Sequence, residues 1–127
     1  EAYLLDPRAE WFTALKDAAD QMAAIGPDPG VRSAADVVYL LKFADLPACP
    51  DPAFYRAGAQ AIWTRHIGVY GTMVGLVEYI RDARAASYPN GIIPWDISAW
   101  VEAAMLMDAV FPAGGHAAEA AAMAEVI

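Results

Sequence analysis

Cysteine is almost absent from this sequence. Cys49 is the single cysteine in a chain of 127 residues, so no disulfide can form within the chain, and a disulfide-stapled secreted scaffold is excluded. Cysteine usage of this kind fits a reducing compartment, and we expect a cytoplasmic protein. Cys49 lies in a proline-rich segment without a basic neighbour, which argues against a reactive thiol.

Long apolar runs are also missing. The uncharged stretch from Ile67 to Val77 is among the longest in the chain. It is far shorter than the ~20 residues that a membrane-spanning helix needs. We therefore expect a soluble protein that does not insert into membranes.

Positive charge is scarce. Eight Lys and Arg residues stand against sixteen Asp and Glu residues, which gives a net charge of −8, and every Lys and Arg lies at or before Arg84. Phosphate backbones and anionic lipids repel such a chain, so we expect no nucleic-acid partner. The acidic surface is most simply a solvated face that aids solubility; a face that docks on a basic partner is the alternative.

The residue patterns of common catalytic and metal sites are lacking. His66 and His116 are the two histidines and lie far apart in the sequence, so the usual ligand set for zinc or a di-iron centre is incomplete. Ser33 and Ser98 are best explained as helix caps rather than nucleophiles. The glycines do not follow the dinucleotide-binding pattern. We expect no metal and no cofactor.

Apolar residues, by contrast, are abundant. Ala, Val, Ile, Leu, Met, Phe, Trp, Tyr and Cys make up 58% of the chain, and the nine glycines take the total above the ~45–50% usual for globular domains. The excess must cover a partner surface, line a pocket, or stand exposed as alanine, which costs little in water.

Proline and glycine mark where helices begin and end. Asp6-Pro7 and Asp51-Pro52 each join a side chain that accepts from free backbone N–H groups to a proline suited to a first helical turn. Between such signals, apolar residues recur at spacings of three and four, as they do in amphipathic helices. The segment Ile92-Ile93-Pro94 is expected to be extended. Helices are predicted over residues 7–25, 33–45, 52–86, 96–111 and 116–127, with turns at 26–30 and 88–91.

The stretch 52–86 is the most distinctive of these segments. It is longer than an average globular helix, so we expect a kink or break near Gly68. It is apolar nearly all round, which is typical of a helix in the middle of a bundle or at a subunit interface. The sequence therefore predicts a single all-α domain over residues 1–127: a compact bundle of four to six helices around this central, nearly all-apolar helix.

Glycines inside that helix need a cause, because each costs about 1 kcal/mol relative to alanine. Gly71 and Gly75 lie four residues apart on one face, where another helix could approach closely. A kink or a ligand-facing groove are the alternatives. Together with Val74 and Trp63, these two glycines form the predicted interface.

His66 is the strongest candidate for a polar site. The weak catalytic candidates are His66, Arg65, Tyr70 and Glu78, although Glu78 lies roughly 18 Å from His66 along a continuous helix. A buried, hydrogen-bonded core histidine is the simpler explanation. If a ligand pocket exists, the residues expected to line it are Trp63, His66, Tyr70, Trp100 and Met107.

These patterns favour a non-enzymatic role. We expect a helical assembly or interaction subunit that forms a homo-oligomer or docks on a larger protein. The alternative is a protein that binds a small apolar ligand, or a small helical enzyme, with a pocket between helices around His66.

Overall fold

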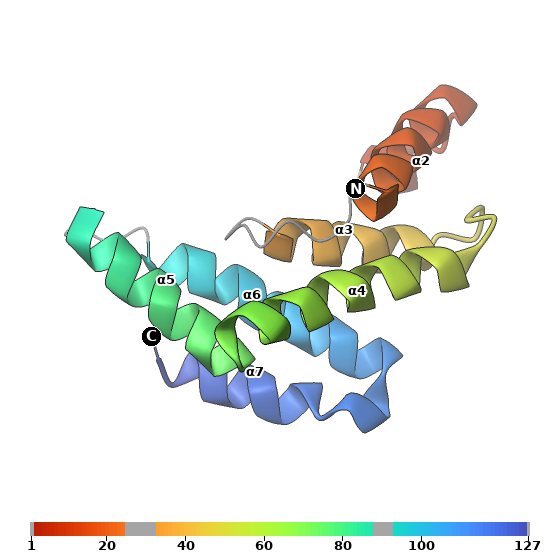
Figure 1. The fold of residues 1–127 in the computed structure, drawn as a ribbon. Coiled ribbons are helices and arrows are strands. Elements are labelled where there is room, and N and C mark those ends of the chain that lie inside the picture. The colour runs from red at the N-terminus through yellow and green to blue at the C-terminus, as the bar shows by residue number, and fades with distance from the viewer. Residues whose placement is uncertain (1, 25–32, 88–92, 127) are drawn as a thin grey trace.

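The computed structural model in Figure 1 describes residues 2–24, 33–87 and 93–126, and the regular elements in these ranges are all helical. The predicted turns at 26–30 and 88–91 lie outside the described residues. In chain order the elements are α1 (Ala2–Leu5), α2 (Ala9–Ala24), α3 (Ser33–Ala44), α4 (Pro52–Tyr70), α5 (Met73–Ser87), α6 (Ile93–Val110), the 3₁₀ helix η1 (Pro112–Gly114) and α7 (His116–Ala124).

The predicted all-α bundle is confirmed. Six of the described α-helices have nine or more residues, and α1 adds a single turn that the sequence patterns did not reveal. One local expectation was wrong: α6 already begins at Ile93, where an extended segment was predicted. Pro94 fits the first helical turn because the backbone N–H groups there have no hydrogen-bond partner within the helix. Proline has no backbone N–H, so no helical hydrogen bond is lost at this position.

The ends of α4 show how the sequence sets helix boundaries. At its start, the Asp51 side chain accepts a hydrogen bond from the Phe54 N–H at 3.2 Å, and Pro52 occupies the first turn, as predicted. At its end, Gly71 adopts φ +78°, a conformation that residues with a side chain rarely adopt. The expected break therefore lies three residues beyond Gly68.

The core lies where α3, α4, α5, α6 and α7 meet. Figure 1 shows α4 crossing in front of α6, with α7 beneath α6 and α2 projecting from one end beside α3. The largest side chains with almost no exposed surface belong to Leu40, Leu41, Trp63, His66, Met73, Leu76, Ile80, Ile97, Trp100, Met107 and Met123. Within the described ranges, no helix is long and apolar enough to cross a bilayer.

The segment from α4 to α5 has one buried and one exposed side. Ile62, Trp63 and His66 face the core from α4, whereas Ala61 and Gly68 are exposed. The stretch is apolar in composition nearly all round, as predicted, but the protein buries only part of its circumference. Alanine and glycine make up much of the exposed side, and they cost little in contact with water.

Candidate functional site

His66 lies in the core against aromatic rings. Its side chain has no exposed surface, and its ring centroid is 4.7 Å from that of Trp100 and 6.2 Å from that of Tyr70. Its Nδ1 atom lies 2.8 Å from the carbonyl oxygen of Ile62. Because a carbonyl oxygen only accepts, Nδ1 carries the proton in this contact. His66 therefore has the geometry of a hydrogen-bonded core histidine.

The residues expected to line a pocket around His66 pack against one another instead. The Trp63 and Trp100 rings meet at 5.8 Å, edge to face, and Met107 is fully buried in the same apolar cluster. Neither of the two surface hollows described below includes Trp63, His66, Tyr70, Trp100 or Met107. The protein's own side chains occupy this region.

Of the weak catalytic candidates, Tyr70 stacks on His66, but the side chains of Arg65 and Glu78 do not join them in the core. Arg65 and Glu78 are exposed while His66 is buried, and α4 ends between His66 and Glu78. The pKa of Arg81 is raised mainly by its hydrogen bond to Asp82, and the charge of Glu78 adds to this effect.

The predicted interface residues are used within the chain. Gly71 ends α4, and Val74 is half-buried. A Cβ atom on Gly75 would lie 2.5 Å from the carbonyl oxygen of Tyr70, so this glycine lets the two helices approach closely at the turn. Trp63 is only 2% exposed. Of the three explanations offered for the glycines, a break fits Gly71 and close backbone approach fits Gly75.

A polar contact that sequence patterns did not reveal fixes α7 to α4. The indole N–H of Trp63 donates to Glu119 Oε2 at 3.1 Å, and His116 Nδ1 lies 3.2 Å from the same oxygen. The Trp63 and His116 rings meet edge to face at 5.3 Å. The His116–Glu119 spacing of three residues was readable in the sequence, but the contact with Trp63 was not.

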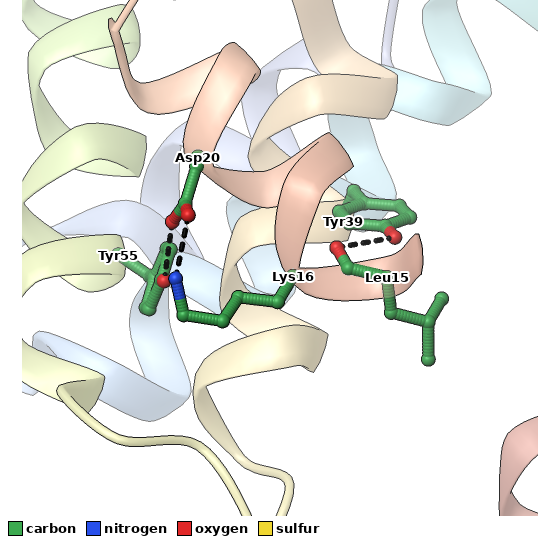
Figure 2. Close-up of polar contacts among 5 residues, drawn as sticks. All are labelled: Leu15, Lys16, Asp20, Tyr39 and Tyr55. Atoms are coloured by element: carbon green, nitrogen blue, oxygen red, sulfur yellow. Dashed lines mark hydrogen bonds and ion pairs between the residues drawn. The ribbon is translucent and has the colours of Figure 1, made fainter. Parts of the chain in front are cut away.

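A second polar cluster holds α2 against its neighbours, as Figure 2 shows. Tyr55 on α4 donates to Asp20 Oδ1 at 2.6 Å, and Lys16 donates to Asp20 Oδ2 at 2.6 Å. Tyr39 on α3 donates to the carbonyl oxygen of Leu15 at 3.0 Å. Two tyrosine hydroxyls from different helices thus reach α2.

The charges in this cluster favour a structural role. The hydrogen bond from Lys16, followed by that from Tyr55, holds the pKa of Asp20 below its usual range. Burial, followed by the hydrogen bond to Asp20, raises the pKa of Tyr55 to about 12. Tyr55 therefore keeps its proton at neutral pH and acts as a donor rather than a base.

An apolar cavity of about 660 Å³ opens between α1, α2, α3 and α6. Lys42 and Glu102 form an exposed ion pair of 3.3 Å at its rim. The residues that line the cavity are Tyr3, Leu4, Leu15, Ala35, Val38, Tyr39, Lys42, Phe43, Asp45, Leu46, Pro47, Ala99 and Glu102.

The outer face of α4 forms a shallow open hollow. We call the exposed strip of α4 from Phe54 to Val69 its outer face. Phe54 is 50% exposed and Val69 is 51% exposed. The hollow itself is lined by Ala57, Gln60, Ala61, Thr64, Arg65, Gly68 and Val69.

Within residues 2–24, 33–87 and 93–126, no group of three His, Cys, Asp or Glu side chains is placed to hold a metal ion.

Neither a family model, nor a curated protein, nor a solved structure matches this chain. The cavity and the exposed outer face of α4 are therefore the features that bear on function.

Proposed function

We propose that this chain is a non-enzymatic helical subunit that associates through the outer face of α4. The observation that carries the proposal is the exposure of Phe54 and Val69 at the two ends of a strip that contains Ala57, Ala61 and Gly68. An apolar strip of this kind, with polar residues at its edge, is typical of an interaction surface. A cytoplasmic location stays a prediction from the cysteine content.

The lack of acidic residues in α4 lowers the repulsion between two copies of this chain that meet through it. Residues 52–70 contain Arg56 and Arg65 but no Asp or Glu, in a chain whose net charge is −8. Two acidic molecules repel each other least where their acidic side chains are sparse. Among the surfaces described, the outer face of α4 meets that condition.

Light scattering over a range of protein concentrations tests the proposal. We expect the wild-type mass to exceed that of the monomer as concentration rises, and Ala61→Arg to keep the protein monomeric. Ala118→Arg is the matched control, because Ala118 is an exposed alanine on α7. A wild-type protein that is monomeric at high concentration, or an equal effect of both substitutions, would contradict association through this face.

The cavity between α1, α2, α3 and α6 supports a second candidate function, the binding of a small apolar ligand. Its volume of about 660 Å³ lies within the ~300–1,000 Å³ typical of ligand pockets. Its walls are mainly apolar and its rim carries Lys42 and Glu102. This site replaces the one expected around His66.

A neutral apolar dye such as Nile red tests this second function. We expect saturable fluorescence with the wild-type protein and its loss in Ala99→Phe, which would fill the cavity from α6. Ala118→Phe introduces the same ring on a different helix and should bind the dye like the wild type. Fluorescence that never saturates, or that Ala99→Phe leaves unchanged, would exclude the cavity as the binding site.

A further inference from the structure

Large and small residues on the outer face of α4 are placed at matching distances on opposite sides of Ala61. Relative to Ala61, Ala57 and Arg65 lie four residues away in opposite directions, and Phe54 and Gly68 lie seven away. All five are exposed. Spacings of four and seven keep residues on one side of a helix, so these positions form a single stripe.

Two such stripes fit each other when they run in opposite directions. With a two-fold axis at Ala61, Phe54 of one copy meets Gly68 of the other. A Cβ atom on Gly68 would have nothing within 4 Å, so the space beside this residue is open to a ring from outside the chain. The long side chain of Arg65 then lies across Ala57, where its aliphatic part covers a small residue.

We propose that two copies of this chain pair through α4, antiparallel, about a two-fold axis at Ala61. This proposal rests on the proposed function and names its partner. The arrangement is isologous: each copy uses the same surface, as the symmetry of most soluble dimers requires. Ala61 meets Ala61 at the axis, where two small residues allow the helices to come close.

A parallel pair fits less well. It would place Phe54 on Phe54 and Arg65 on Arg65, which sets bulk against bulk and like charge against like charge. In the antiparallel pair the two Arg65 Cα atoms lie eight residues apart along the helices, or about 12 Å at 1.5 Å per residue. That separation exceeds the Debye length of about 8 Å at physiological ionic strength, so their repulsion is largely screened.

The size of the surface sets the expected strength. A helix of 19 residues is about 28 Å long at 1.5 Å per residue. One pair of such helices covers less than the ~800 Å² per partner of a standard stable interface. We therefore expect a dimer that forms and dissociates with concentration.

Disulfide cross-linking tests the direction and the axis of this pairing. In a Cys49→Ser background, which removes the native cysteine, Ala61→Cys should cross-link to itself on oxidation. Ala57→Cys and Arg65→Cys should each cross-link poorly alone, because the two equivalent cysteines of a dimer lie about 12 Å apart along the helices and a disulfide requires Cα atoms within ~7 Å. An equal mixture of the two should cross-link as a heterodimer.

The controls separate the two proposals. Ala118→Cys on α7 reports collisional cross-linking, and light scattering on the Cys49→Ser protein reports association without any cross-link. If the protein associates but Ala57→Cys or Arg65→Cys cross-links efficiently alone, the antiparallel pairing is wrong while association stands. If the protein stays monomeric and Ala61→Cys cross-links no faster than Ala118→Cys, both proposals fail.

Discussion

Gly68 and Gly75 differ in the space around them. The space beside Gly68 is open, whereas a side chain on Gly75 would press on the carbonyl oxygen of Tyr70 at 2.5 Å. The Tyr70 oxygen is backbone, so it gives way less readily than the end of a flexible side chain. The same substitution should therefore have opposite effects at these two positions.

We predict that Gly68→Ala raises the free energy of unfolding by about 0.5–1 kcal/mol, because alanine has the higher helix propensity. Gly75→Ala should lower it by about 1–3 kcal/mol, because the added methyl group forces the turn between α4 and α5 to shift. Urea denaturation at low protein concentration, where the monomer dominates, measures both. A change of the same sign in both variants would contradict this account of the turn.

The sequence predicted the state of some site residues but not their partners. His66 was expected to be buried because it falls on an apolar stripe, and it has no exposed surface. The contact between Trp63 and Glu119 spans 56 residues, and one sequence has no local periodicity that reports such a distance. The apolar stripe also did not indicate that the space around His66 would be filled by Trp100.

At the scale of helices, α2 is held in position by hydrogen bonds as well as by apolar contacts. Ala19 is its one fully buried residue, and the hydroxyl groups of Tyr55 and Tyr39 reach it from α4 and α3. Tyr55 is itself 2% exposed, so its hydroxyl group is costly to ionise.

This cluster predicts a loss of stability at alkaline pH. The pKa of Tyr55 rises from 10.0 to about 12 on folding, so the folded state holds this proton more tightly than the unfolded state does. The resulting stabilisation is fully present below about pH 10 and is lost as the pH rises towards about 12. Denaturation measured across this range should show a shallower loss for Tyr55→Phe than for the wild type. Tyr79→Phe, at a half-exposed position, should follow the wild type; equal slopes for wild type and Tyr55→Phe would contradict the role of Tyr55.

Some helix boundaries marked by proline or glycine were predictable, but the start of α6 at Ile93 was missed although Pro94 lies in its first turn. Asp51-Pro52 marked the start of α4 because both residues act locally. The single turn of α1 is below the length at which helical hydrogen bonding becomes cooperative, so periodicity does not reveal it. The exposure of half of α4 was missed because Ala61 counts as apolar in a pattern yet lies in contact with water.

The charge of the whole molecule predicts how association responds to salt. Each copy carries a net charge of −8, and the proposed contact is apolar with no acidic residue in α4. Added salt screens the repulsion between copies more than it weakens that contact. We therefore predict more dimer at high ionic strength, measured by light scattering at constant protein concentration. Association that weakens as salt is added would indicate a contact dominated by opposite charges instead.

The cavity exists only while α2 stays packed against the rest of the protein. Leu15 on α2 and Tyr3 and Leu4 on α1 form part of its wall. Locally attached units open more often than the rest of a fold. If α1 and α2 swing away together, that wall disappears and the cavity with it. A molecule bound in the cavity would therefore hold α1 and α2 in place. The amide protons of α2 should then exchange more slowly in the presence of the ligand than in its absence.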